Sequence, residues 1–453
     1  MRLSLRTLHA LPQDADRFTY DRGAQAIGIV HFGIGAFHRA HQAWYTDQAM
    51  DEGDRDWAIC GVSLRSRSVA DQLVPQDGLY TVTTRSGEGA QVRVIGAVRE
   101  VLFALDDGAA IVARIADPAC RIVSFTVTEK GYCRTGAGDL NLRLAQESFY
   151  PLLGRALAQR AEAGLGGITL LSCDNLADNG TVLHRLMRRW MMENEPDALD
   201  WFETHCTAPS SMVDRIVPRS TDKDRSALQA QLGMADEGAV FTEDFSQWVI
   251  EDRFANGRPS WEKVGAEMVC DVVPYETAKL RMLNGAHSFL AYAGLAAGHE
   301  FVHQAIADPQ LCALARRLML EEALPSITAA PGQDLDRYAE ELIVRFNNPS
   351  LRHRLDQIAM DGSQKLPQRW LDTVRWHWSQ DAPTPAIRKG FEAWRQHCAR
   401  NSCVDDPFKD RLVEAAQSTD RSEFLDICFG EYGDTQSIWS EYVFLRSIFK
   451  SAE

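Results

Sequence analysis

The chain has 453 residues and a formal net charge of −15, from 48 basic and 63 acidic side chains. Its length predicts two or three domains, and its acidic balance argues against a nucleic-acid partner or an anionic membrane surface. No apolar run approaches the roughly 18 residues of a membrane span, and the N-terminus lacks the apolar core of a signal peptide. The ten scattered cysteines form no Cys-x-x-Cys pair. We therefore expect a reduced, cytoplasmic protein.

The first predicted element is a strand at residues 26–32, followed by a glycine-containing turn and a helix to about residue 50. Strand, Gly-x-Gly and helix in this order are typical of a dinucleotide-binding fold, because the glycines allow a tight turn and close approach of the pyrophosphate. His38 stands where the third glycine of that motif is usual, and an ordinary strand–helix turn also fits. The candidate cofactor-binding residues are Gly33, Ile34, Gly35, Ala36, Phe37, His38 and Arg39, together with Glu129 at the end of a later strand.

The second predicted strand covers residues 57–64. In an NAD site an acidic residue often ends this strand and binds the ribose hydroxyls. Here Arg65 and Arg67 follow the strand instead, and Asp71 is the nearest downstream acid. The pattern therefore leaves NAD and NADP both open.

The following elements alternate between strand and helix. Residues 79–84 and 91–96 predict a hairpin, and buried strands are expected at 121–127 and 167–173, with helices at 111–116, 151–163 and up to about 192. Such alternation predicts a mostly parallel, doubly wound sheet. Its ligands should lie beyond the C-terminal strand ends, where Gly33, Gly35, Glu129 and Asn175 are placed.

Residues 210–273 are mixed, with strands expected at 212–217, 247–251 and 267–273, and from Tyr275 onward the pattern is helical. We therefore expect a Rossmann-type α/β domain at 1–273 and a mainly α-helical domain at 274–453. The first helix of the second domain, residues 274–292, carries Glu276, Lys279, Asn284 and His287 in an otherwise apolar run. At about 100° per residue they share an arc of roughly 140°, which predicts a site that holds a substrate oxygen.

Five motifs together resemble the polyol-specific long-chain dehydrogenases, the mannitol dehydrogenase family. They are Gly-Ile-Gly-Ala-Phe-His-Arg-Ala-His, Thr-Val-Thr-Glu-Lys-Gly-Tyr, Ser-Cys-Asp-Asn…Asn-Gly, Met-Val-Asp-Arg-Ile-Val-Pro and Lys-x4-Asn-Gly-x-His. The match runs from about residue 26 to about 380. Within the family, the stretches around residues 247, 279 and 360 look closer to the fructuronate reductases (D-mannonate oxidoreductases) than to the mannitol enzymes. The last 60 or so residues carry no matching motif.

The resemblance implies a nicotinamide-dependent oxidoreductase that works without zinc and is a monomer or weak oligomer. Lys279 matches the family's catalytic lysine, the general acid and base; burial and nearby cations would bring its pKa down from about 10.4. Asn284 and Asn175 match asparagines that bind the substrate oxygen, in an active site expected at the domain interface. His287 is expected to orient that oxygen.

Each of these residues also has a structural interpretation. The alternatives are that Lys279 is a solvated helix lysine, that Asn175 is a helix N-cap and that His287 is a core histidine. Glu276 could gate a proton path or form an ion pair with Lys279, and the sequence does not decide between the two.

The substrate is expected to be a sugar acid, such as D-mannonate in exchange with fructuronate. Asp214 is a candidate acceptor for its hydroxyls, and Lys365 and Arg369 are candidates for its carboxylate, because cations in a closed site form charge-assisted hydrogen bonds. Arg352 and Arg354 compete for that role. The alternative is a mannitol- or arabinitol-type polyol 2-dehydrogenase.

Two other functions are compatible with parts of the sequence, a zinc hydrolase and a non-catalytic NAD-binding sensor. His299-Glu300-Phe301-Val302-His303 satisfies the H-E-x-x-H pattern of zinc hydrolases. Gly294 and Gly298 suggest that a helix ends just before it, whereas the motif needs both histidines within one helix. We therefore expect no metal site there. A non-catalytic NAD-binding sensor is the other alternative, and the joint presence of Lys279, Asn284 and His287 argues against it.

Overall fold

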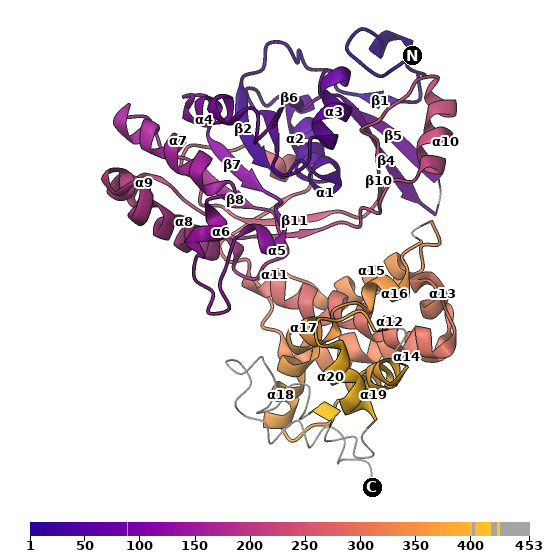
Figure 1. Ribbon diagram of the computed structural model, residues 1–453. Coiled ribbons are helices and arrows are strands. Elements are labelled where there is room, and N and C mark those ends of the chain that lie inside the picture. The colour runs from indigo at the N-terminus through magenta and orange to yellow at the C-terminus, as the bar shows by residue number, and fades with distance from the viewer. Residues whose placement is uncertain (88, 351, 401–403, 418–423, 426–453) are drawn as a thin grey trace. The chain divides into compact units, whose positions relative to one another are not determined.

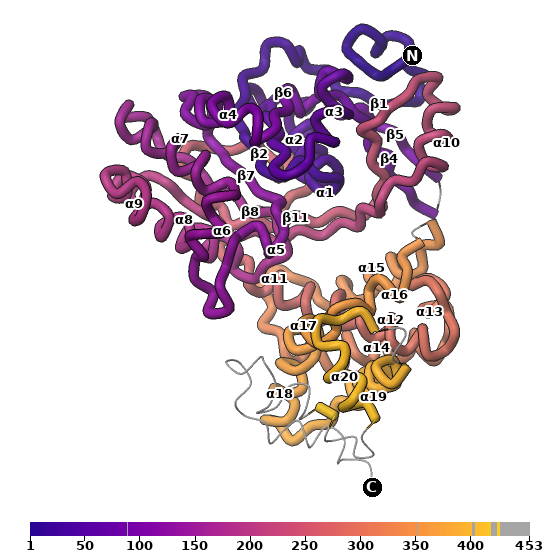
Figure 2. The backbone as a smooth tube through the Cα atoms, viewed as in Figure 1, coloured from indigo at the N-terminus to yellow at the C-terminus, as the bar shows by residue number. Residues whose placement is uncertain are grey.

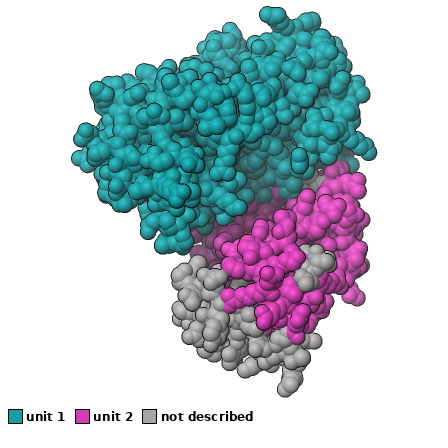
Figure 3. Space-filling model, in the orientation of Figure 1, with its two compact units in different colours: residues 1–272 teal, residues 273–453 magenta. Residues whose placement is uncertain are grey.

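The structure is a computed structural model, which describes residues 1–87, 89–350, 352–400, 404–417, 424 and 425. The chain divides into two compact units, unit 1 at Met1–Val272 and unit 2 at Val273–Glu453 (Figure 3). The backbone completes unit 1 before it enters unit 2 (Figure 2). None of the helices in the described part of the chain combines the length and apolar character needed to cross a bilayer.

Unit 1 is built around a five-stranded sheet with the order β6-β3-β2-β7-β8, in which all pairs are parallel (Figure 1). Its strands are β2 (Ile27–Phe32), β3 (Ala58–Ser63), β6 (Val98–Phe103), β7 (Ile122–Phe125) and β8 (Thr169–Ser172). Every residue of β2, β3, β7 and β8 is buried. Continuous burial of this kind occurs where helices cover both faces of a parallel sheet. The predicted doubly wound arrangement is confirmed.

Alternate residues of β2 enter two different cores. Val30 and Phe32 pack in one core with helix residues that include Ile111, Leu153 and Leu186, whereas Ile29 packs in another with Tyr45 and Met50. The helices of unit 1 are α1 (Ala36–Ala40), α2 (Gln42–Asp51), α3 (Ser68–Leu73), α4 (Gly108–Ala116), α5 (Thr128–Gly131), α6 (Leu142–Ala145), α7 (Tyr150–Glu162), α8 (Asn179–Asn194), α9 (Leu199–His205) and α10 (Asp222–Leu232). The single helix expected after the glycine turn is in fact broken at His41, whose φ of −121° and ψ of −96° separate α1 from α2.

Two smaller sheets complete unit 1. One has the order β1-β5-β4-β10 and contains the predicted hairpin, β4 (Tyr80–Ser86) paired antiparallel with β5 (Gly89–Ile95), together with β1 (Asp16–Arg17) and β10 (Val240–Glu243). The other has the order β12-β11-β9, formed by β9 (Ser211–Asp214), β11 (Gln247–Glu251) and β12 (Glu267–Val269). The strands expected at 212–217 and 267–273 are therefore shorter than predicted.

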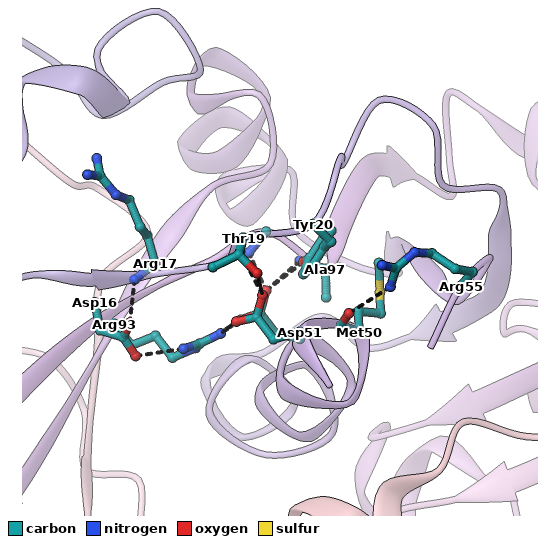
Figure 4. A network of polar contacts seen from close by, with 11 residues as sticks. Asp16, Arg17, Thr19, Tyr20, Met50, Asp51, Arg55, Arg93 and Ala97 are labelled. Carbon is teal, nitrogen blue, oxygen red and sulfur yellow. Dashed lines mark hydrogen bonds and ion pairs between the residues drawn. The ribbon is translucent and has the colours of Figure 1, made fainter. Parts of the chain in front are cut away.

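An ion-pair network, buried at Asp47 and exposed at Asp16, joins the N-terminal segment to this framework (Figure 4). Arg93 of β5 bonds Asp16 at 2.6 Å and also contacts Asp51, which accepts the Thr19 backbone N–H at 2.6 Å. Arg93 also bonds Asp47 at 2.9 Å and 2.7 Å, and the Asp47 side chain is fully buried. A buried carboxylate is tolerated only when donors surround it. The network therefore ties β1, α2 and β5 together.

Unit 2 is helical, as predicted. Its α-helices are α11 (Val273–Ala278), α12 (Gly285–Ala297), α13 (Val302–Ala307), α14 (Pro309–Arg317), α15 (Leu335–Phe346), α16 (Leu355–Ile358), α17 (Gly362–Leu366), α18 (Asp372–Ser379), α19 (Pro385–Ala399) and α20 (Lys409–Ala416). Three further segments are π-helical: η5 (Lys279–Asn284), η6 (Leu318–Ala323) and η8 (Pro367–Leu371). Segment η5 packs against both η6 and η8. Because π-helix is rare and occurs frequently at functional sites, these three segments mark a candidate functional region of unit 2.

Candidate functional site

The Gly-x-Gly turn follows β2 directly. Gly33 has a φ of +96°, and a Cβ there would lie 2.2 Å from the Thr126 carbonyl oxygen, so only glycine fits. Two hydrogen bonds hold the turn in place. The Gly33 N–H donates to the Val62 carbonyl at 2.8 Å, and Thr126 Oγ1 donates to the Gly33 carbonyl at 2.7 Å. At Gly35 a Cβ would meet nothing closer than 3.7 Å, so protein atoms leave the space around it open. This geometry fits the pyrophosphate of a dinucleotide.

The side chains of His38 and Arg39 are both buried in unit 1. His38 is fully buried, stacks on His31 with ring centroids 3.4 Å apart, and has no hydrogen-bond partner among the described residues. Burial and the neighbouring His31 hold its pKa well below the ordinary value. Arg39 is also buried; its guanidinium contacts the Gly238 carbonyl and lies over the Tyr80 ring. Both side chains therefore support the turn from inside unit 1.

The other predicted residues of unit 1 lie at strand ends. Glu129, in α5 after β7, and Asn175, three residues after β8, are both exposed, and β2, β7 and β8 are adjacent in the sheet. Asn175 is not a helix N-cap, because α8 begins at Asn179 with Asp178 in the capping position. Asp214 is the buried last residue of β9, in the three-stranded sheet. The structure thus gathers the glycine turn, Glu129 and Asn175 at one edge of the central sheet.

In unit 2, the expected single α-helix at 274–292 is wrong in one respect. α11 ends at Ala278, Lys279–Asn284 form the π-segment η5, and α12 begins at Gly285. The assumption of 100° per residue therefore fails here. A π-helix bonds residues i and i+5 and has about 4.4 residues per turn. Lys279 and Asn284, five positions apart, consequently lie closer to one face than an α-helix would place them.

Side chains from η8 bind the junction of η5 and α12. Arg369 donates from Nη1 to Ser288 Oγ at 2.8 Å and to the Asn284 carbonyl at 3.4 Å, and Trp370 Nε1 donates to the Gly285 carbonyl at 3.1 Å. Burial lowers the pKa of Arg369 to about 10, so it stays charged at neutral pH. In the described part of the chain no carboxylate pairs with Arg369. A largely buried cation without an acidic partner is a candidate for anion binding, because an anion would offset the cost of burying its charge.

His287 lies in the first turn of α12 and is buried. Its ring contacts Phe346 at 4.7 Å and His353 at 5.4 Å between centroids, and its Nε2 has no hydrogen-bond partner among the described residues. Burial, and then the neighbouring His353 and Arg345, hold its pKa well below the usual range. His287 is therefore neutral at physiological pH and can donate or accept a hydrogen bond.

The remaining candidates are placed as follows. Lys279 is buried, at 8% exposure, and Glu276 is partly exposed on α11. Lys365 donates to the Met360 carbonyl at 2.7 Å, with Asp361 at 3.9 Å; burial, and then Arg369, lower its pKa.

The two arginines that compete for a substrate carboxylate are both exposed. Arg354 is occupied by Glu300 at 2.8 Å and Asp356 at 2.6 Å. Arg352 lies over the Phe301 ring at 4.8 Å. Arg369 is therefore the strongest candidate for an anion.

The H-E-x-x-H pattern is divided by a helix boundary. α12 ends at Ala297 with Gly298 in the left-handed cap position, and α13 begins only at Val302. His299 therefore precedes the helix that contains His303, and the two do not stand one turn apart on one helix as the zinc motif requires.

Sequence reasoning missed three residues of these two regions. Ser288 binds Arg369, His353 packs on His287, and the Asp174 side chain binds the turn after β7. Ser288 lies one position after His287 in the helix that we had singled out. His353 carried no signal, because the pairing of distant loop residues leaves no periodic pattern in a sequence.

Two family profiles match the chain. Residues 27–263 match the mannitol dehydrogenase Rossmann domain, and residues 271–425 match the mannitol dehydrogenase C-terminal domain. D-mannonate oxidoreductase of Escherichia coli (strain K12) is 44% identical over 397 residues, 84% of this chain and 82% of that protein. Mannitol 2-dehydrogenase of Phaeosphaeria nodorum (strain SN15) is 37% identical over 422 residues, 88% of this chain and 74% of that protein.

Two solved structures share the fold. Pseudomonas fluorescens mannitol 2-dehydrogenase, in a ternary complex with NAD and D-mannitol, matches with a TM-score of 0.84 and 34% identity, over 100% of this chain and 96% of that chain. D-sorbitol dehydrogenase in substrate-free form matches with a TM-score of 0.88 and 32% identity, over 100% and 98%. The resemblance expected from the five motifs is confirmed. The chain belongs to the mannitol dehydrogenase family of oxidoreductases.

Proposed function

We propose that this oxidoreductase is a cytoplasmic, NAD-dependent and zinc-independent dehydrogenase that interconverts a secondary alcohol of an aldonate with the corresponding ketone, as D-mannonate with D-fructuronate. The open glycine turn of unit 1 supports dinucleotide binding. All eight described cysteines are free thiols, which supports a reducing compartment. A bound nicotinamide would supply the hydride acceptor or donor.

The residues of unit 2 would handle the proton and the oxygen. Lys279 would take the hydroxyl proton in oxidation and return it in reduction, as general base and acid. Asn284, on the same π-segment, would donate an N–H group to the oxygen as its negative charge develops, which is worth roughly 2.7–4 kcal/mol per donor. In unit 1, Asn175 is the second asparagine that the family resemblance proposes as a ligand of the substrate. Neutral His287 would orient that oxygen. Glu276, near the start of the helix, would exchange the Lys279 proton with solvent.

The observation that carries the choice of substrate is Arg369. Its guanidinium is largely buried beside Asn284 and has no carboxylate partner among the described residues. A polyol offers no charge to such a group, whereas an aldonate carboxylate would satisfy it with charge-assisted hydrogen bonds. Lys365, four residues earlier, would add a second cation, and Asp214 would accept substrate hydroxyls. The 44% identity to D-mannonate oxidoreductase agrees with this choice.

The second candidate is a polyol 2-dehydrogenase of the mannitol or arabinitol type. The similarity to mannitol 2-dehydrogenases and to the structure that contains D-mannitol favours it. NADP also stays open, because Arg65 and Arg67 follow β3 where an acid often binds the NAD ribose.

A substrate panel separates these candidates. Purified protein is mixed with mannonate, altronate, mannitol or arabinitol, with NAD or NADP, and the rise of the NADH absorbance band is followed. We expect kcat/KM to be highest for an aldonate with NAD. A preference for mannitol or arabinitol would establish the polyol candidate instead, and no absorbance change with any substrate would favour a sensor that binds NAD without catalysis.

A further inference from the structure

The side chain of Asp174, just beyond β8, binds the turn that follows β7. Its Oδ2 accepts the Val127 N–H at 3.0 Å and its Oδ1 accepts the Thr128 N–H at 2.9 Å. The Tyr132 hydroxyl also lies 2.9 Å from Oδ2 and 2.6 Å from Ser172 Oγ. Burial raises the pKa of the Asp174 carboxyl, and these donors oppose the shift. One carboxylate thus receives three donors from a neighbouring strand end.

The turn held in this way has an unfavourable backbone conformation. Thr128 has a φ of +64°, in the left-handed region that a β-branched residue rarely enters. Such a conformation is energetically unfavourable and persists only where the surroundings impose it. Gly131 is part of that constraint, because a Cβ there would lie 2.7 Å from the Val127 side chain. The two N–H bonds to Asp174 are on the strained residue and the one before it.

Asp174 connects two candidate site residues, Glu129 for the cofactor and Asn175 for the substrate. Asn175 follows it directly, and Glu129 follows the strained Thr128. The Asp174 backbone is itself fixed, because Asn179 Nδ2 donates to its carbonyl at 3.1 Å and to the Ser211 carbonyl at 2.7 Å. The Ser-Cys-Asp-Asn motif therefore carries a second interaction besides that of its asparagine.

We propose that Asp174 is a positioning residue: it holds the turn after β7 in its left-handed conformation, and so places Glu129 for the cofactor and Asn175 for the substrate. The inference rests on the proposed function. If the carboxylate acts by holding Thr128 at a positive φ, then glycine at position 128, which adopts such a φ without strain, should make the carboxylate less necessary.

The test compares Asp174→Asn with the double variant Asp174→Asn/Thr128→Gly. Asparagine keeps the shape of the Asp174 side chain but replaces one of its two acceptor oxygens with an NH2 group. That group would face the N–H of Val127 or Thr128 and could not accept its hydrogen bond. We expect amide hydrogen exchange of Val127 and Thr128 to accelerate in the cofactor-free Asp174→Asn protein. We also expect the NADH Kd to rise by about 10- to 100-fold, as for lost bonds to a charged group. Thr128→Gly in the same chain should restore most of the affinity.

Asp139→Asn is the matched control, because Asp139 is exposed and its nearest cation, Arg185, is 3.5 Å away. If Asp174→Asn fails to fold, Tyr132→Phe removes a single donor and should raise the NADH Kd by a smaller factor. Exchange and affinity unchanged from Asp139→Asn would overturn the proposal. So would a loss of affinity that Thr128→Gly does not recover. A wild-type protein that binds no NADH, while its Val127 and Thr128 amides stay protected, would refute the proposed function and not the turn geometry.

Discussion

The glycine turn gives two matched substitutions that separate folding from cofactor binding. In Gly33→Ala, the new Cβ would lie 2.2 Å from the Thr126 carbonyl oxygen at a φ of +96°. The backbone conformation alone costs about 1–3 kcal/mol. Relief of the overlap would also stretch the Gly33 bonds to Val62 and Thr126, of 2.8 Å and 2.7 Å, at roughly 1 kcal/mol each. We expect a destabilisation of about 3–5 kcal/mol.

Gly35→Ala is the counterpart. Its Cβ would meet only the Gly33 carbonyl, at 3.7 Å, and the φ of −81° suits any residue. We expect stability to change by less than about 0.5 kcal/mol. The added methyl group would occupy the space that a pyrophosphate needs, so the NADH Kd should rise at least tenfold.

Thermal unfolding and NADH fluorescence titration measure the two effects. Gly33→Ala should lower Tm by roughly 6–20 °C, at about 2–4 °C per kcal/mol for a unit of this size. Gly35→Ala should keep the wild-type Tm and lose affinity. A Gly33→Ala protein as stable as the wild type would refute the turn geometry, and a Gly35→Ala protein with normal NADH affinity would refute its assignment to the dinucleotide.

The remaining predictions concern buried charges and proton binding. Burial lowers the pKa of His31 to about 3 and of His353 to about 4, so the folded state binds fewer protons than the unfolded one. The two histidines should therefore contribute their whole stabilisation above about pH 6.5. As the pH falls from 6.5 toward their folded-state pKa values, the free energy of unfolding should drop by roughly 1.4 kcal/mol per pH unit for each histidine. Urea unfolding at pH 7, 6 and 5 measures this free energy, and a value that does not change with pH would contradict the prediction. Asp47→Asn should destabilise unit 1 by about 3–5 kcal/mol, because Arg93 loses its buried partner, whereas Asp16→Asn, at a side chain 65% exposed, should cost under about 1 kcal/mol; equal losses in urea unfolding would argue against the network. Arg369→Gln should raise KM for mannonate at least tenfold and leave any activity on mannitol unchanged; parallel losses on both substrates in steady-state kinetics would remove Arg369 from substrate selection.

The sequence was informative where one interaction dominates a whole element. Strands β2, β7 and β8 are mainly apolar because helices cover both faces of the sheet, and that pattern can be recognised in the sequence without a structure. Gly33 was identifiable because a φ of +96° excludes every other residue. The helix end at Gly298 was visible for the same reason.

The sequence was not informative where the backbone departs from regular geometry without glycine or proline. Lys279–Asn284 contain ordinary helix formers, and a six-residue π-segment is too short to change the apolar period that a sequence displays. The sequence likewise gives no sign of the break between α1 and α2 at His41. The burial of Arg39 depends on the Gly238 carbonyl, almost 200 positions away, and no local pattern encodes such a contact.

Lys279→Ala tests the central claim, acid–base catalysis by this family member, most directly. The single-turnover rate of the best aldonate of the panel is measured at saturating NAD, beside the NADH Kd, with the exposed Lys263→Ala as control. We expect Lys279→Ala to keep the wild-type NADH Kd and to lose at least about 10²-fold in rate, as for removal of a general acid–base, while Lys263→Ala keeps both. A Lys279→Ala protein with a near-normal rate would contradict the account.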